Sequence, residues 1–299
     1  MDYVAQLKNL PVEHEFFIGF DSDGCIFDTM EIKQKECFCP AIIKHFGLQA
    51  ASKYAREVWE FVNLYSKTRG CNRFNAVERA LDLMKERPEF KTRGIDVPHM
   101  PEMRQWIKEE SKLGNPALEA KVAAGHSEEL TMLLAWSKEV NKVITEIVHG
   151  IPPFPGVIDV LKKSHGKADK IVVSQTPLEA LTREWMENKI DHYLNAIAGQ
   201  EHGTKSEHLS YAAKGKYASN KILMVGDAPG DLKAAKANDA LFYPIIPGRE
   251  EESWAKFADE ALDKFFKLEF EGKYQQELME EFDKALPTEP HWADHRSAR

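Results

Sequence analysis

Short apolar runs that alternate with helical stretches fill the second half of this 299-residue chain. They lie at 170–174, 195–199, 221–226 and 241–246, and segments with helical periodicity separate them. Strands that alternate with helices predict parallel β-α-β units. A fifth apolar run, at 15–20, stands alone near the start of the chain. The pattern therefore predicts a parallel sheet whose first strand is separated from the others by a long insertion.

The insertion is mostly helical in pattern, with apolar residues on one helical face in 74–84 and again in 130–148. The turn-rich stretch Pro88–Pro101 is expected to be irregular. Three prolines and a glycine at 152–156 then form a stiff junction. After the last strand, the apolar residues of 254–266 follow the spacing of an amphipathic helix.

These boundaries predict an α/β protein: a Rossmann-like parallel sheet core with an inserted α-helical cap. We assign residues 1–30 and 150–299 to the core, including a C-terminal helical tail, and residues 31–149 to the cap.

Composition narrows the classes of function. The formal net charge of −8 argues against a nucleic-acid binder or a protein of anionic membrane surfaces, because both need a basic footprint. No apolar stretch approaches the roughly 18 residues of a membrane helix, and the N-terminus lacks the pattern of a signal peptide. We therefore expect a cytoplasmic protein with no membrane partner. The four cysteines lack the spacing of a zinc or redox pair, so reduced thiols are expected.

Acidic residues directly follow two of the predicted strands. Asp21 and Asp23 follow the first strand, with Gly24 permitting a tight bend, and such a pair suits a nucleophile with a general acid/base. Asp227 and Asp231 follow the strand at 221–226. Ligands of open α/β sheets bind beyond the carboxyl ends of strands, and converging carboxylates favour a hard cation such as Mg²⁺. The alternatives are a solvated Asp/Gly turn for the first pair and a helix cap for Asp231.

Two further segments carry groups that could hold a phosphate. Ser174, Gln175 and Thr176 follow the strand at 170–174, where hydroxyls and backbone N–H groups can bind phosphate oxygens. The alternative is a plain turn in which Thr176 caps the next helix. Lys205 is a lone lysine, and alone it would be read as a solvated surface residue.

The four segments in this order resemble the haloacid dehalogenase (HAD) superfamily of phosphotransferases, in its phosphatase and phosphoglycolate phosphatase-like branch. FIGFDSDGCIFDT resembles the first motif, IVVSQT the second and VGDAPGD the fourth, while Lys205 takes the place of the third-motif lysine. IPPFPGVIDVLKK resembles the junction at which the chain returns from a cap. Two departures are Cys25, where the family often has Thr or Val, and Gln175, where Asn is frequent.

The resemblance implies a role for each matching residue. Asp21 would attack phosphorus, and Asp23 would protonate the leaving oxygen and later activate water. Ser174 and Lys205 would hold and neutralise the transferring phosphoryl group. Mg²⁺ would be bound by the Asp21 carboxylate, the Asp23 carbonyl and Asp227, with Asp231 as a supplementary ligand or a partner of Lys205.

The insertion offers a candidate for substrate recognition. Residues 50–80 hold a local excess of basic residues, which suits an anionic ligand. Gly70 and Arg73 resemble the Gly-x-x-Arg of the specificity loop in related caps, and Gln175 offers an amide to a substrate. The alternative for the basic residues is an ordinary solvated helix start.

The sequence thus predicts a Mg²⁺-dependent phosphohydrolase for a small phosphorylated metabolite, acting through an aspartyl-phosphate. A phosphomutase with the same motifs is the nearest alternative. A non-catalytic phospho-ligand-binding module is the alternative from another class, although its usual sign, a lost nucleophile or metal ligand, is not found.

Overall fold

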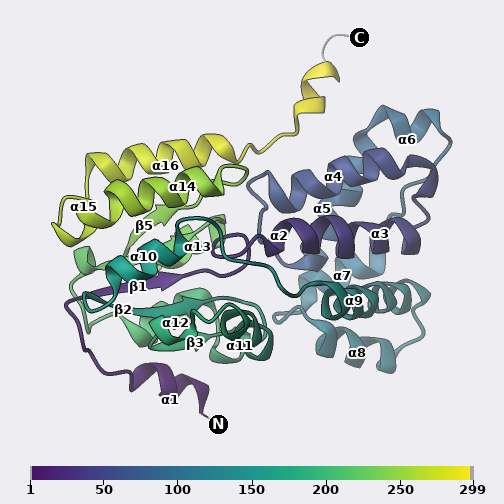
Figure 1. The fold of residues 1–299 in the computed structure, drawn as a ribbon. Helices are drawn as coiled ribbons and strands as arrows, with labels where there is room; N and C mark the ends of the chain where they lie inside the picture. Colours follow the sequence, from purple (N-terminus) through teal and green to yellow (C-terminus); the bar gives the residue numbers. More distant parts are fainter. Residues whose placement is uncertain (1, 297–299) are drawn as a thin grey trace. The chain divides into compact units, whose positions relative to one another are not determined.

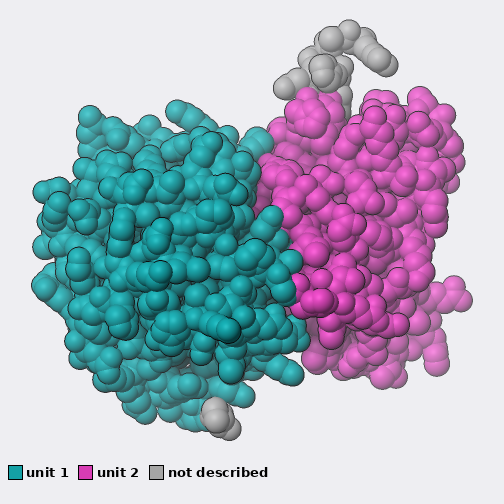
Figure 2. Space-filling model, viewed as in Figure 1, with its two compact units in different colours: residues 1–30, 150–287 teal, residues 31–149, 288–299 magenta. Residues whose placement is uncertain are grey.

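The computed structural model describes residues 2–296, which divide into two compact units (Figures 1 and 2). Unit 1 contains the chain up to Met30 together with Gly150–Pro287. Unit 2 contains Glu31–His149 and the segment that begins at Thr288.

Unit 1 is built on a five-stranded, all-parallel sheet with the strand order β3-β2-β1-β4-β5. The strands are β1 (Phe16–Phe20), β2 (Ala168–Val173), β3 (Ala196–Ala198), β4 (Ile222–Gly226) and β5 (Leu241–Pro244). The first strand in sequence is central, so both of its neighbours come from beyond the insertion. The predicted fold class is confirmed, and Pro244 lies on an edge strand, where a missing N–H is tolerated.

Helices cover both faces of this sheet. The helices of unit 1 are α1 (Tyr3–Lys8), α10 (Val157–Ser164), α11 (Leu178–Glu187), α12 (Lys205–Ala212), α13 (Pro229–Ala237), α14 (Glu250–Lys256), α15 (Leu262–Phe266) and α16 (Lys273–Ala285). Side chains of α10, α11, α14 and α15 share one apolar cluster with the β1 residues Phe16, Ile18 and Phe20. Side chains of α12, α13 and α16 share another with Phe17, on the opposite face. Because both faces are covered, β1 and β4 are continuous apolar runs.

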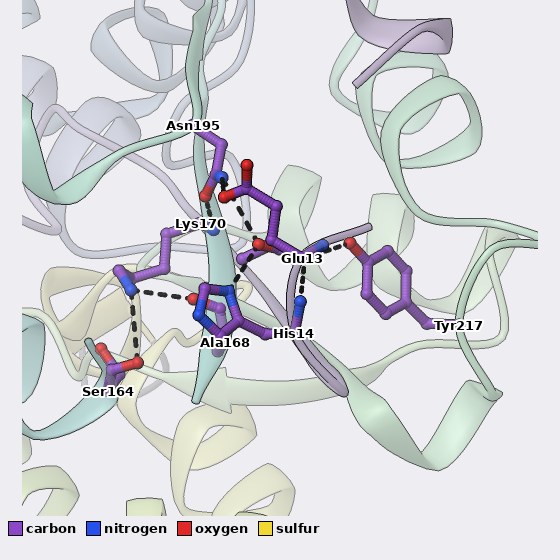
Figure 3. A network of polar contacts seen from close by, with 8 residues as sticks. Glu13, His14, Ser164, Ala168, Lys170, Asn195 and Tyr217 are labelled. Carbon is purple, nitrogen blue, oxygen red and sulfur yellow. Dashed lines mark hydrogen bonds and ion pairs between the residues drawn. The ribbon is translucent and has the colours of Figure 1, made fainter. Parts of the chain in front are cut away.

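A polar network joins the chain segments at the amino ends of the strands (Figure 3). The buried Asp169 carboxylate accepts hydrogen bonds from the backbone N–H groups of Glu13 and His14, both 3.0 Å, and from the Tyr217 hydroxyl at 2.7 Å. Asn195 also donates to it, at 3.4 Å. The segments that lead into β1, β3 and β4 therefore meet at Asp169 of β2. This network lies at the amino ends of the strands, whereas the predicted motifs lie at their carboxyl ends.

Unit 2 is helical throughout its described secondary structure. Its helices are α2 (Thr29–Ile32), whose first residues belong to unit 1, and α3 (Cys39–His45), α4 (Ser52–Leu64), α5 (Arg73–Glu86), α6 (Pro88–Thr92), α7 (Pro101–Glu109), α8 (Asn115–Ala124) and α9 (Glu128–Ile147). A cluster of aromatic rings forms the centre of its core; the Trp59 and Trp136 ring centroids are 6.1 Å apart. The stretch from Pro88, expected to be irregular, begins with the short helix α6.

The end of the tail differs from the prediction, which placed residues 150–299 entirely in the core. The described part of the segment that begins at Thr288, residues 288–296, belongs to unit 2. The Trp292 ring lies 5.5 Å from the Phe61 ring and 4.5 Å from the guanidinium of Arg87, both within unit 2. Aromatic and cation–π contacts of this kind favour burial of a tryptophan side chain. The helical periodicity of the preceding tail does not predict these contacts, because their partners lie far away in the sequence.

Among the residues that the structure describes, no helix is long and apolar enough to span a membrane. All four cysteines are free thiols.

Candidate active site

The loop after β1 holds Asp21 and Asp23 in a tight turn. The backbone N–H of Asp21 donates to the carbonyl of Val225 on β4, at 2.9 Å, so Asp21 extends the sheet by one residue. The carbonyl of Ser22 then accepts hydrogen bonds from the N–H groups of Ile26 and Phe27, at 2.9 and 3.1 Å. Gly24 has φ 76°, in the left-handed region that favours glycine. The chain thus reverses directly beyond the strand.

The carboxylates of Asp21, Asp227 and Asp231 converge at the carboxyl ends of β1 and β4. All three side chains are buried, and one oxygen of each lies within 4.8 Å of the others. Asp231 approaches the strand so closely that a Cβ at Gly226 would lie 2.4 Å from its carboxyl carbon. Gly226 therefore makes room for this carboxylate.

Lys205 is the cation of the cluster. It is the first residue of α12, and its ammonium lies 2.9 Å from Asp21 and 2.6 Å from Asp231. Burial alone would lower the pKa of Lys205, but Asp21 and Asp231 outweigh it and the pKa is raised, so the amine stays protonated. The second oxygen of Asp231 accepts the backbone N–H of Ala228, at 3.0 Å. Asp231 is thus not the N-cap of α13, as one interpretation of the sequence had it, but accepts the N–H of the N-cap residue Ala228 and also pairs with Lys205.

The charges of the cluster do not balance. Burial raises the pKa of Asp21, and Asp231 and Asp227 raise it further, while Lys205 acts in the opposite direction. Three buried carboxylates against one ammonium leave a deficit of positive charge when all are ionised. An oxygen-lined, negatively charged cluster is the donor set that Mg²⁺ prefers, so Asp21, Asp227 and Asp231 fit a magnesium ion.

The Asp23 carboxylate faces two hydroxyl groups. Thr29 donates to one oxygen and Thr176 donates to the other, the latter at 2.7 Å. Thr176 is not the cap of α11, because the N-cap residue of that helix is Pro177 and the Leu178 N–H donates to the Glu201 carboxylate, at 2.9 Å. Sequence reasoning gave neither threonine a contact with Asp23, although it named Thr176 as a possible phosphate ligand. Both residues lie within the segments that resemble the first and second motifs, which was the signal that could have identified them.

The second motif lies beside the first. Ser174 is buried at the end of β2, where its N–H donates to the Ala198 carbonyl at 3.0 Å and its hydroxyl accepts the N–H of Thr176 at 3.2 Å. Gln175 is exposed, and its amide donates to the carbonyl of Gly203 at 2.9 Å. That contact ties the second-motif loop to the segment that leads into Lys205.

Gly70 and Arg73 lie in unit 2. Gly70 is exposed and has φ 71°. The Arg73 guanidinium donates to the Ser137 hydroxyl at 3.0 Å and to Asn141 at 2.7 Å, and it lies over the Phe38 ring. Burial lowers its pKa to about 10. The partners that the described residues give this cation are neutral, so its charge is not offset by a neighbouring carboxylate.

Comparison with known proteins gives one family match. The profile of the haloacid dehalogenase-like hydrolase family matches residues 97–243, a range that includes Ser174, Lys205, Asp227 and Asp231 and begins after Asp21 and Asp23. No curated protein gives a significant match.

Several solved structures are similar to this chain at low sequence identity. A candidate phosphoglycolate phosphatase from Lactobacillus delbrueckii subsp. bulgaricus is 16% identical, with a TM-score of 0.50 over 87% of this chain and 100% of that one. Another from Haemophilus somnus is 14% identical, with a TM-score of 0.45 over 79% and 87% of the two chains. A candidate HAD-type hydrolase from Bacillus subtilis, described as bound to magnesium, is 13% identical, with a TM-score of 0.43 over 80% and 92%. Likeness at this level of identity concerns the fold.

The parallel sheet, with acidic residues at its carboxyl edge and a helical insertion after its first strand, defines an α/β protein of the haloacid dehalogenase type. Over residues 97–243, the chain is similar to the haloacid dehalogenase-like hydrolases.

Proposed function

We propose that this protein is a Mg²⁺-dependent phosphohydrolase that acts on a small phosphorylated metabolite through an aspartyl-phosphate on Asp21. The observation that carries the proposal is the pairing of the Asp21 carboxylate with Lys205, at 2.9 Å, beside two further buried carboxylates. A nucleophile, a fixed cation and a set of oxygen ligands are the parts that phosphoryl transfer needs, because its catalysis is mainly positioning and charge stabilisation.

The proposed reaction has two steps. A carboxylate oxygen of Asp21 attacks phosphorus, the ester P–O bond breaks, and Asp23 gives a proton to the leaving oxygen. Asp23 then takes a proton from water, which attacks the acyl-phosphate, so that inorganic phosphate leaves and the Asp21 carboxylate is restored. Thr29 and Thr176 hold the Asp23 carboxylate, each by a hydrogen bond to one of its two oxygens.

The other residues stabilise the charge on the phosphoryl group. Lys205 places a permanent positive charge beside the attacking oxygen, and the Ser174 hydroxyl and the backbone N–H groups that follow it offer hydrogen bonds to phosphoryl oxygens. Asp21, Asp227 and the Asp23 carbonyl would hold Mg²⁺, with Asp231 orienting Lys205 or serving as a supplementary ligand. When bound, the ion would supply positive charge to the transferring group.

The test of this proposal is phosphate release from a panel of phosphorylated sugars, hydroxy acids and nucleosides, with Mg²⁺ and then with excess EDTA. We expect turnover of at least one class of ester with Mg²⁺ and its loss on chelation. Conversion to an isomer without phosphate release would indicate a phosphomutase. Saturable binding without turnover would indicate a phospho-ligand-binding module.

We further propose that unit 2 is a cap and that Arg73, with the turn at Gly70, recognises an anionic group of the substrate away from the reacting phosphate. The described hydrogen-bond partners of the Arg73 guanidinium are neutral, and desolvation lowers the pKa of Arg73. A bound anionic group would therefore offset the positive charge of this partly desolvated guanidinium. Gln175 would contribute an amide from the core side.

Replacing Arg73 with methionine keeps the apolar stem against Phe38 and removes the charge. We expect kcat/KM for the preferred substrate to fall about ten-fold or more, as the loss of a charged hydrogen bond predicts. The loss for p-nitrophenyl phosphate, which carries no second anionic group, should be small. Arg79→Met, on the same helix, is the matched control. Equal losses on both substrates would remove Arg73 from substrate recognition.

A further inference from the structure

Ser22, between the two aspartates of the first motif, makes two side-chain hydrogen bonds to α11. The indole N–H of Trp185 donates to the Ser22 hydroxyl oxygen at 3.1 Å, and that hydroxyl donates to the Glu184 carboxylate, also at 3.1 Å. Ser22 and Trp185 are fully buried, and the Trp185 ring packs edge-on against Phe27 of the same loop, with the centroids 5.7 Å apart. The side chain of Ser22 thus has one fixed donor and one fixed acceptor.

The Ser22 backbone is held independently, because its carbonyl accepts hydrogen bonds from Ile26 and Phe27. The side chains before and after Ser22 make different contacts: Asp21 pairs with Lys205 of α12, and Asp23 accepts a hydrogen bond from Thr176. Freeing the Ser22 side chain would allow this peptide to rotate and would move both carboxylates.

The same end of α11 also holds the chain where it returns from unit 2. The Asn188 amide donates to the Ile151 carbonyl at 3.0 Å, and the Glu187 carboxylate accepts the N–H of Gly150 at 3.4 Å. These residues follow Glu184 by three and four positions, the spacing of one helical face. At its other end, α11 begins directly after the loop of Ser174 and Thr176.

We propose that Glu184 is a positioning residue. Through its hydrogen bond to Ser22, it sets the orientation of the loop after β1, which carries Asp21 and Asp23, relative to the loop after β2, which carries Ser174. Trp185 is the second residue that anchors Ser22. This inference rests on the proposed phosphohydrolase function. Glu184 does not touch the reacting atoms, so its substitution changes the rate of the chemical step and leaves substrate binding nearly unchanged.

The test compares Glu184→Gln, Ser22→Ala and the double variant with wild-type protein, in Mg²⁺ with the best ester found in the panel. Glu184→Gln should lower kcat about ten-fold, because small misplacements of reacting groups are costly, with KM within about two-fold. Since Glu184 acts through Ser22, the double variant should be no slower than the slower single variant. Glu179→Gln, an exposed acid on the same helix, should behave as wild type.

Two measurements distinguish a loss of kcat caused by displaced catalytic groups from one caused by a less stable fold. Melting temperatures should fall by no more than a few degrees, leaving every variant folded at the assay temperature. Trp185→Phe keeps a ring against Phe27 but removes the N–H, and it should reproduce the loss of kcat. If Ser22→Ala does not fold, this variant takes its place in the cycle with Glu184→Gln.

A wild-type kcat in Glu184→Gln, or losses that multiply in the double variant, would overturn the positioning role and leave the proposed function standing. A loss of kcat that only follows the fraction of unfolded protein would do the same. An absence of turnover by the wild-type protein on every ester would overturn the proposed function, and this inference with it.

Discussion

Replacing Asp21 with asparagine should abolish phosphate release from every ester while leaving the fold intact. Asparagine keeps the shape of the side chain but cannot form an acyl-phosphate, and losing a catalytic nucleophile costs at least about a thousand-fold in kcat. Because burial and the neighbouring carboxylates raise the pKa of Asp21, its ionised form at neutral pH destabilises the folded state. In metal-free buffer, the melting temperature of Asp21→Asn should therefore equal or exceed that of the wild type.

The matched control for this substitution is Asp239→Asn. Asp239 is an exposed acid of unit 1, paired with Lys214 at 3.2 Å, and its φ of 56° is one that asparagine readily adopts. This variant should retain wild-type kcat and KM. Wild-type turnover in Asp21→Asn, with the substitution verified by mass, would rule out Asp21 as the nucleophile.

Replacing Gly226 with alanine should inactivate the protein without touching a proposed catalytic group. The added Cβ would lie 2.4 Å from the carboxyl carbon of Asp231 and 2.5 Å from its Cβ. Asp231 would have to move, and with it the ammonium of Lys205, which it holds at 2.6 Å. We expect a loss of about 1–3 kcal/mol in the free energy of unfolding, typical of overpacking, and about a hundred-fold loss of kcat from displaced groups.

Gly230→Ala provides the control within the same loop. A Cβ there meets no atom within 4 Å, and Gly230 lies in the first turn of α13. Alanine favours a helix over glycine by up to about 1 kcal/mol, so this variant should be as stable as the wild type or more so, with unchanged kcat. Equal behaviour of the two variants in thermal unfolding and turnover would show that the space at Gly226 is not needed for Asp231.

The strands could be predicted because they are buried on both faces. β1 and β4 are continuous apolar runs that end at an aspartate and a glycine, and the structure places them within about one residue of the prediction. The end of the tail could not be predicted in this way. Trp292 binds to Phe61 and Arg87, which are more than 200 positions away, and no local periodicity encodes such a contact.

Part of the candidate site was likewise beyond the sequence. Lys205 looks like any surface lysine until α12 brings its ammonium to Asp21, 184 positions earlier. The hydrogen bond from Thr176 to Asp23 joins the loops that follow β2 and β1, and the one from Ser22 to Glu184 joins the loop after β1 to α11. Ser, Thr and Glu are common in loops and on helices, so their roles depend on which loops the sheet brings together.

The sequence by itself determined the alternation of strands and helices, the long helical insertion and the acidic residues at strand ends, because hydrophobic period and turn chemistry are local properties. Only the tertiary structure decided which of these residues meet. The order β3-β2-β1-β4-β5 puts the first strand between partners from beyond the insertion, and this arrangement gathers Asp21, Asp227, Asp231 and Lys205 in one buried cluster. Pairing between strands so far apart in the sequence depends on the packing of the whole core, and patterns among neighbouring residues do not predict it.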